Sequence, residues 1–193
     1  DDGATTWLVV DAGDAEPLLA WLLRMRFRLA VELRAADELV VVATSADGPA
    51  HDLVVGSAAA PNGVPLVWRD PWPGVSAGGW GYAAADPHPG ATRRWAESLV
   101  PVDALDALAG AVVTGAVAAA GLVSVDALRI AAWRPRWATE RDERTIPHEV
   151  DWLRTAVHLD KGCYRGQETV AKVHNLGHPP RRLVLLHLDG SDS

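Results

Sequence analysis

The segment from residue 61 to residue 91 restricts the fold most, because proline and glycine are concentrated there. It holds six of the chain's 13 prolines. Proline lacks the backbone N–H that a helix or a central strand needs, and glycine weakens both elements. We therefore predict that 61–91 is mostly loop, with a short strand near Val67. Three tryptophans of this segment either wall a cleft for a flat ring or fill the core: Trp68, Trp72 and Trp80.

The regions on both sides of this loop show strand and helix patterns. Before it we predict strands at 7–11, 28–35 and 39–45, the last two forming a hairpin around Asp37-Glu38, and a helix at about 15–26 with Asp14 as its N-cap. After it we predict helices at 102–120, ending at Gly121, and at 166–175, stopped by Gly177, with a helical turn and then a strand within 123–133. This order predicts an α+β fold, with helices packed on an antiparallel sheet.

The charge of the chain is acidic overall but unevenly distributed. The net charge is −7, and residues 1–128 carry a net of −9 against +2 for residues 129–193. Acidity argues against direct nucleic-acid binding. Between Lys161 and Arg182 there are five basic residues and one acid. That local excess either suits an anionic small molecule or is a solvated surface.

Two further features concern the compartment of the protein. No apolar run is long enough to cross a membrane, so we expect no membrane partner. The single cysteine fits a reducing compartment, and we predict a cytoplasmic protein. The chain opens on Asp1-Asp2-Gly3 and closes soon after a strand-like run at 182–188, so we expect both ends to be cut from a longer protein.

That cysteine lies in the octapeptide Lys161-Gly-Cys-Tyr-Arg-Gly-Gln-Glu168. A lone thiol forms no internal disulfide and holds no cluster by itself. Lys161 and Arg165 place positive charge beside the sulfur, which favours the thiolate, and the glycines allow close approach of a partner. The competing interpretation is a small buried hydrophobic residue in a turn. We predict that Cys163 is at least partly accessible, at a loop-to-helix junction.

The octapeptide resembles the K-G-C-Y-x-G-Q-E signature of the YgfZ family, folate-binding maturation factors for iron–sulfur proteins. This family is related to the glycine-cleavage T-protein, an aminomethyltransferase. Three further segments resemble T-protein motifs in order and spacing: 142–149 (D-E-x-T-x-P-x-E), 128–130 (the L-R-[LI]-E strand, with Ala131 in place of Glu) and 97–101 (E-x-x-V-P).

The resemblance implies a fold and a truncation. The parent fold is a ring of ferredoxin-like α+β subdomains with a terminal β-barrel and folate in its central hole. Residues 1–180 would form the folate-binding core without the first subdomain, and 181–193 would start the barrel. The catalytic carboxylate of the aminomethyltransferases would lie upstream of Asp1.

The resemblance also implies roles for five residues. Glu97 would bind the pterin edge, since a carboxylate accepts two adjacent N–H groups. Arg129 would bind a folate carboxylate, and Tyr164 would stack on a ring. Cys163 with Lys161 would be the reactive pair. The structural alternatives are an exposed strand glutamate, an arginine paired to a nearby acid, and a packing tyrosine. We expect Glu97 and Arg129 to share a concavity with a tryptophan on its wall, and we predict no metal site, because no Cys/His spacing matches zinc.

Two functions follow from this resemblance. The first is a tetrahydrofolate-binding accessory protein that helps assemble or repair iron–sulfur client proteins, with an effect on tRNA modification. The alternative is a tetrahydrofolate-dependent aminomethyl or methyl transferase, whose family lacks the octapeptide. A third possibility is an inert fragment that keeps the fold alone.

Overall fold

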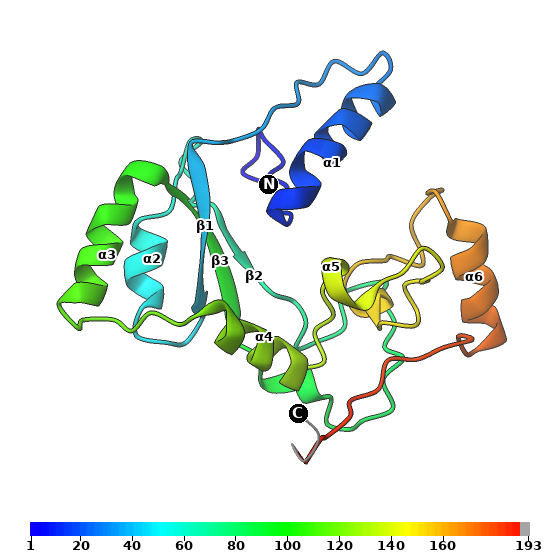
Figure 1. Ribbon diagram of the computed structural model, residues 1–193. Helices are drawn as coiled ribbons and strands as arrows, with labels where there is room; N and C mark the ends of the chain where they lie inside the picture. The colour runs from blue at the N-terminus through cyan, green and yellow to red at the C-terminus, as the bar shows by residue number, and fades with distance from the viewer. Residues whose placement is uncertain (190–193) are drawn as a thin grey trace. The chain divides into compact units, whose positions relative to one another are not determined.

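The chain forms two units, each built from two stretches that alternate along the sequence. The computed structural model describes residues 1–189. Unit 1 comprises Asp1–Asp70 and Arg94–Ala119, and unit 2 comprises Pro71–Arg93 and Ala120–Ser193. Each unit has its own buried residues. The colour along the chain in Figure 1 shows the segments that form them.

A three-stranded antiparallel sheet organises unit 1. Its strands are β1 (Leu39–Ser45), β2 (Val67–Arg69) and β3 (Trp95–Pro101), in the order β1-β3-β2. The central strand β3 thus pairs on both sides, whereas β1 and β2 lie at the edges. Together with the helices, this sheet confirms the predicted α+β class.

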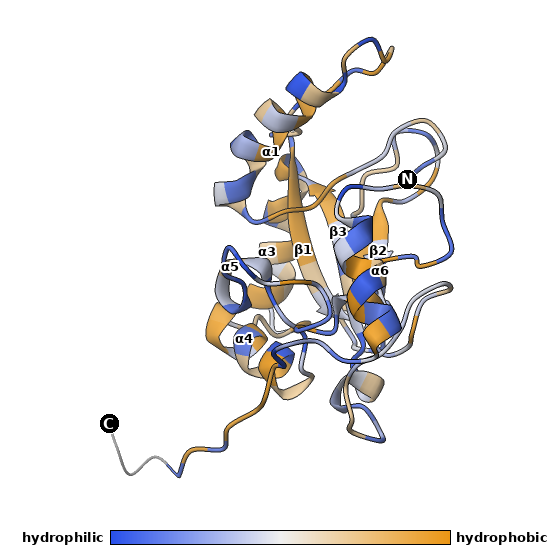
Figure 2. Ribbon diagram, turned by 90° about the vertical axis from the view of Figure 1, so that its right-hand side faces the viewer, coloured by the Kyte–Doolittle hydropathy of each residue, from blue (hydrophilic) through white to orange (hydrophobic). Residues whose placement is uncertain are grey.

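One face of the sheet carries the core of unit 1. Burial alternates along β3, with Ala96, Ser98 and Val100 buried and the residues between them half-buried. The short helix α2 (His51–Gly56) packs against β1 and β3 and contributes buried Val54. Figure 2 shows the mainly hydrophobic colouring of β1. Complete burial of a valine such as Val100 contributes about 2 kcal/mol to folding.

The helices of unit 1 differ in their ends from the prediction. Helix α1 (Ala12–Met25) begins earlier than expected, with Asp11 rather than Asp14 at the N-cap, and none of its residues is buried. The predicted helix 102–120 is a 3-10 turn, η2 (Val102–Ala104), followed by α3 (Leu105–Val113). It stops early because Gly115 adopts a φ of +75°, which leaves the right-handed helical region.

Two predicted strands of unit 1 do not form. Residues 7–11 and 28–35 have no strand structure, while 39–45 is β1 as predicted. A strand requires a neighbour for its backbone groups, and neither segment pairs with another strand among residues 1–189. The predicted hairpin of 28–35 with 39–45 around Asp37-Glu38 is therefore wrong. Two-residue hairpin loops favour central residues with positive φ, which Asp37 and Glu38 do not adopt.

Unit 2 is built from short helices and long loops. Its elements are η1 (Pro89–Thr92), α4 (Leu122–Ala131), α5 (Trp137–Glu140), η3 (Trp152–Arg154) and α6 (Gln167–Leu176). Helix α6 ends where Gly177 takes a φ of +87°, as predicted. Residues 181–189, the described part of the predicted barrel start, have no regular secondary structure, and 190–193 lie outside the described residues.

The core of unit 2 surrounds Trp72. This side chain is fully buried, as is Leu153, and its Nε1 donates to the carbonyl of Ala132 at 2.9 Å. The guanidinium of Arg134 lies 5.0 Å from the indole centroid. Of the three tryptophans in 61–91, Trp72 therefore fills a core, whereas Trp68 and Trp80 are exposed. The segment itself is irregular except for β2 and the start of η1, as predicted.

The structure corrects the predicted strand within 123–133. Arg129, expected on a strand, lies in α4. Ala, Leu and Arg are good helix formers, and this segment has no strand beside it in the part of the chain that the structure describes. The turn instead follows the helix, where Trp133 has a φ of +52°. No helix among residues 1–189 is long and apolar enough to cross a membrane.

Candidate functional site

The first candidate site lies on the open face of the unit 1 sheet and centres on Glu97. Because β3 buries every second residue, Glu97 points to the face opposite α2, together with Trp95. The strand register places Trp68 of β2 directly across from Glu97. Residues that oppose each other in an antiparallel pair project to the same face. Trp68, Trp95 and Glu97 thus form what we call the indole–carboxylate site.

The Glu97 carboxylate keeps free bonding capacity at this site. Oε1 accepts a hydrogen bond from Nε1 of Trp95 at 2.9 Å, and Oε2 accepts none from the described residues. A carboxylate oxygen has two acceptor positions, so both oxygens remain open to a pair of adjacent N–H donors. Trp68 is exposed beside it and offers a flat apolar surface. A carboxylate beside a flat apolar side chain can bind the edge and one face of a planar ring that carries two adjacent N–H donors.

Prediction from the sequence missed one member of this site. Trp95 stands two residues before Glu97, the spacing at which strand residues share a face. That spacing was the available signal. The sequence alone places Trp68 in the loop region without a partner, because its pairing with Glu97 depends on a register between segments 29 residues apart.

Arg129 has a different environment, within unit 2. Its guanidinium donates to Asp126 at 2.7 Å, to Glu140 at 2.9 Å and to Thr139 at 3.2 Å, and its side chain is 11% exposed. Burial alone would lower the pKa of Arg129, but the hydrogen bonds from it to the two carboxylates raise it. A folate carboxylate would have to compete with both acids for this guanidinium.

Glu140 is the main partner that holds α5 to Arg129. Burial favours a higher pKa for Glu140, but hydrogen bonds from Thr139, the Arg136 backbone N–H and Arg129 outweigh it and lower that pKa. The ion pair therefore stays charged at neutral pH. Because Glu97 and Arg129 belong to different units, their predicted shared concavity stays a prediction.

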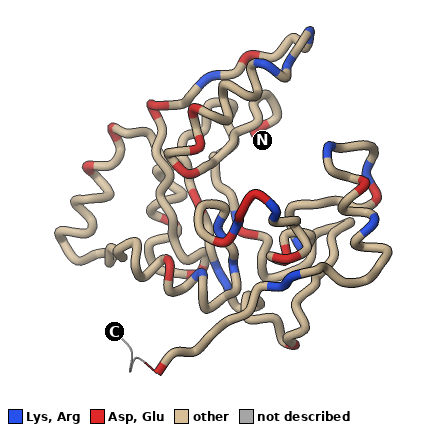
Figure 3. The backbone as a smooth tube through the Cα atoms, turned by 45° about the vertical axis from the view of Figure 1, so that its right-hand side comes forward, with Lys and Arg blue, Asp and Glu red and all other residues tan. Residues whose placement is uncertain are grey.

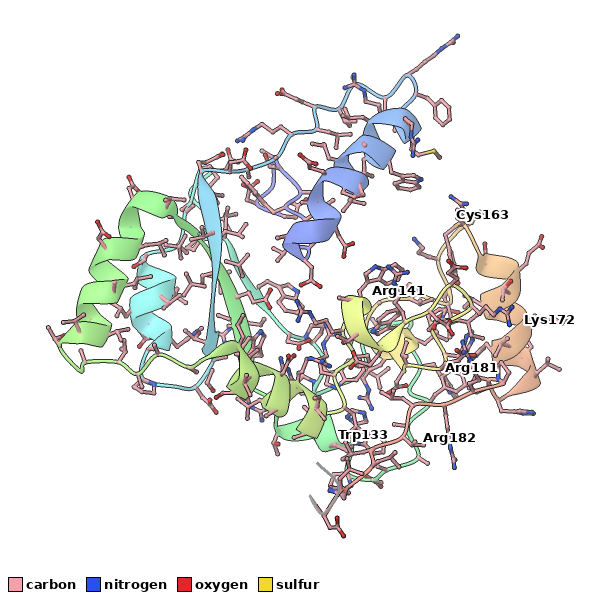
Figure 4. All side chains as sticks on the ribbon, in the orientation of Figure 1. Trp133, Arg141, Cys163, Lys172, Arg181 and Arg182 are labelled. Carbon is pink, nitrogen blue, oxygen red and sulfur yellow. The ribbon has the colours of Figure 1, made fainter. Side chains whose placement is uncertain are left out.

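The second candidate site is the loop that carries the octapeptide. Cys163 is exposed, and Figure 4 shows it at the outer end of the loop before α6. The predicted accessibility at a loop-to-helix junction is confirmed. Gly166, the N-cap of α6, has a φ of +85°, a backbone conformation that residues other than glycine rarely adopt. Lys161 Nζ lies 5.3 Å from the ring centroid of Tyr164, within cation–π range.

The helix behind this loop is anchored by two histidines. His148 is buried, and its Nε2 lies 3.1 Å from the carbonyl oxygen of Val170 in α6. The hydroxyl of Tyr82 lies 3.1 Å from Nδ1 of His174, also in α6. Burial lowers the pKa of His148 and raises that of Tyr82. The thiol therefore precedes a helix that His148 and Tyr82 contact from other parts of unit 2.

Residues 1–189 contain no group of three or more histidine, cysteine, aspartate or glutamate side chains placed to hold a metal ion.

No protein-family model, curated protein or solved structure matches this chain in comparisons with known proteins. The resemblance to the YgfZ family therefore rests on the sequence motifs alone. The contacts of Glu97 with its neighbouring tryptophans and the exposure of Cys163 are observations independent of it.

Proposed function

We propose that this protein is a folate-binding accessory protein for the assembly or repair of iron–sulfur client proteins. Its fold would be that of ferredoxin-like subdomains of the T-protein ring. The observation that carries the proposal is the exposed thiol of Cys163, in the loop directly before α6. A thiol that only filled space would be buried among aliphatic side chains.

The proposed role of the thiol is to give one ligand to client iron. Iron–sulfur clusters are held by thiolates, and one exposed thiolate leaves the remaining positions to the client. Lys161 would position positive charge over Tyr164 beside that thiolate. The glycine at 166 leaves the approach to this loop open, since no atom lies within 4 Å of a Cβ added there.

The proposed folate site is the indole–carboxylate site. Glu97 would accept the adjacent N–H groups of the pterin, and Trp68 would lie against the ring. Tetrahydrofolate supplies one-carbon chemistry when it is bound, and the residues here bind and orient it. This assignment agrees with the position that the resemblance gives to Glu97.

One experiment separates the two parts of the proposal. Cells that lack the protein are complemented with the wild type, Cys163→Ser or Glu97→Gln, in the full-length protein, and the activity of a cluster-dependent tRNA-modifying enzyme is measured. Tetrahydrofolate binding to each purified protein is followed by tryptophan fluorescence. We expect Cys163→Ser to abolish client support with unchanged folate affinity.

The second variant has a different expected profile. Glu97→Gln should weaken folate binding by about 10-fold to 100-fold, because a charged acceptor is lost.

Lys161→Met should reduce client support, while Lys172→Met on the exposed side of α6 is the matched control. Full support by Cys163→Ser, combined with turnover of a folate one-carbon unit, would point instead to the aminomethyl or methyl transferase.

A further inference from the structure

A buried imidazole joins the two edge strands of the unit 1 sheet. His51, the first residue of α2, is 7% exposed. Its Nδ1 lies 3.2 Å from Oγ1 of Thr44 in β1, and its Nε2 lies 2.9 Å from Nη2 of Arg69 in β2. Thr44 and Arg69 both pair with Ala96 of the central strand β3. The imidazole therefore bridges the sheet over the smallest side chain of this row.

The protonation state of this imidazole follows from its two partners. A guanidinium carries only donors, so Arg69 donates and Nε2 of His51 accepts. The neutral ring then carries its proton on Nδ1, which donates to the Thr44 hydroxyl. Both ring nitrogens are satisfied, as burial requires. A proton on Nε2 would instead place two donors and two positive charges against each other.

The surroundings of His51 offer no acid to offset a second positive charge. Helix α2 packs against β1 and β3. Those strands present uncharged side chains to this face: Val40, Val42, Thr44, Ala96, Ser98 and Val100. Within α2, Asp52 is exposed, and among residues 1–189 the polar contacts of His51 are Thr44 and Arg69 alone. Figure 3 shows that the charged positions of unit 1 lie mainly on its helices and loops.

Strand β2 depends on this bridge because it is short. It has three residues, and the bond to His51 is the one side-chain hydrogen bond that it forms in the described part of the chain. A slip of one residue turns every side chain of a strand to the other face. Such a slip would move Trp68 away from Glu97 and bring Arg69 to the open face. The bridge holds Arg69 on the covered face and thereby keeps Trp68 at the indole–carboxylate site.

We propose that His51 is a positioning residue for the indole–carboxylate site and makes this site sensitive to pH. The neutral imidazole fixes Arg69, and with it the register that places Trp68 opposite Glu97. When His51 takes up a proton, Arg69 is released and β2 loses that register. The effect on folate affinity rests on the proposed function, whereas the position of β2 does not depend on a ligand.

Amide exchange measures the position of β2 without a ligand. The Asp70 amide, directly after β2, donates to the Trp95 carbonyl oxygen at 3.0 Å. Arg69→Met removes the bridge but keeps the imidazole, and Arg28→Met, at an exposed arginine after α1, is the matched control. At about pH 7.5 we expect the Asp70 amide to exchange at least about tenfold faster in Arg69→Met than in Arg28→Met. Equal exchange in these two variants would overturn the role of the bridge.

Tetrahydrofolate affinity tests the sensitivity to pH. His51→Gln keeps an oxygen that accepts from Arg69 but takes up no proton, whereas His51→Leu removes the acceptor. At about pH 7.5 we expect His51→Gln to bind within about threefold of the wild type, and His51→Leu to bind at least about tenfold more weakly. From about pH 7.5 to about pH 5.5 the wild type should lose at least about fivefold more affinity than His51→Gln, which shares every other titratable group.

The outcomes for the ligand and for the strand are separable. A wild type that binds no tetrahydrofolate would contradict the proposed function. The protection of the Asp70 amide then still decides the role of His51, since it should decrease with acid in the wild type but not in His51→Gln. Full affinity of His51→Leu, or the same pH dependence in the wild type and His51→Gln, would refute the positioning role.

Discussion

The hydroxyl of Tyr82 lies 3.1 Å from Nδ1 of His174, which joins the loop before η1 to helix α6. The same phenol ring meets the buried ring of His148 edge-on, with centroids 5.1 Å apart. His148 in turn contacts the Val170 carbonyl of α6. Two imidazoles and a phenol thus hold the helix that follows the exposed thiol.

Acid should weaken unit 2 through its buried histidines. Burial lowers the pKa of His148 and of His88, whose Nε2 lies 3.6 Å from Asp151 without a hydrogen bond. Arg154 lowers the pKa of His88 further, while Asp151 opposes the shift. With a lowered folded pKa, the unfolded chain takes up protons first as pH falls below 6.5. Stability is therefore intact above that pH and decreases below it.

The size of this acid effect has an upper limit, and a second histidine serves as the control. Each such imidazole contributes at most about 1.4 kcal/mol per pH unit. We expect the free energy of urea unfolding to decrease from about pH 7 to about pH 5, and His148→Gln to flatten that slope. His178→Gln, on the exposed loop after α6, should keep the wild-type slope. A wild-type slope in His148→Gln would contradict the assignment.

Gly90→Ala should destabilise the core of unit 2. A Cβ at this position would collide with Cδ1 and Nε1 of Trp72 and crowd the Ala132 carbonyl. The resulting overpacking should cost about 1–3 kcal/mol in urea unfolding. Gly74→Ala is the matched control, because nothing lies within 4 Å of its added Cβ. Equal stability of the two variants would show that Trp72 has room to move.

Arg181 should stabilise unit 2 through Glu149. Its Nη2 lies 2.7 Å from Glu149, whose side chain is 6% exposed, and its guanidinium also bonds Asp142. These bonds hold the pKa of Asp142 well below its ordinary value. Arg181→Ala leaves the buried carboxylate unpaired, at a cost of about 1–3 kcal/mol. We measure this by urea unfolding, where the neighbouring Arg182→Ala should change stability by less than about 0.5 kcal/mol. Figure 4 labels both arginines.

The ion pair between α4 and α5 should show measurable coupling. We expect Arg129→Met and Glu140→Gln to be non-additive, with a coupling free energy of about 0.5–3 kcal/mol in a double-mutant cycle. Because both acids already engage Arg129, we also expect Arg129→Met to change tetrahydrofolate affinity by less than about twofold. A larger loss of affinity in this variant would make Arg129 a folate ligand.

Several elements were predictable because their cause is local. The β-branched run of β1 favours a strand in any context, and the prolines of 61–91 remove the N–H groups that regular structure needs. The end of α6 follows from Gly177, which accepts a left-handed conformation without strain. The accessibility of Cys163 followed from its glycine-rich octapeptide.

The indole–carboxylate site was predictable only in part. The sequence pointed to Glu97 through a resemblance, and strand alternation places Trp95 on the same face. The third member, Trp68, joins them only through the register between β2 and β3. Such pairing is long-range, so no window of neighbouring residues contains it.

By itself, the sequence determined the α+β class, the irregular 61–91 segment, β1 and the exposed thiol before a helix. Tertiary structure alone decided that Trp72 is buried while Trp68 and Trp80 are not, and that Arg129 is paired with acids in a helix. Backbone conformation at a residue depends largely on that residue and its few neighbours in the sequence. Burial and charge pairing depend on what distant segments bring into contact, and that information is absent from any short stretch of the chain.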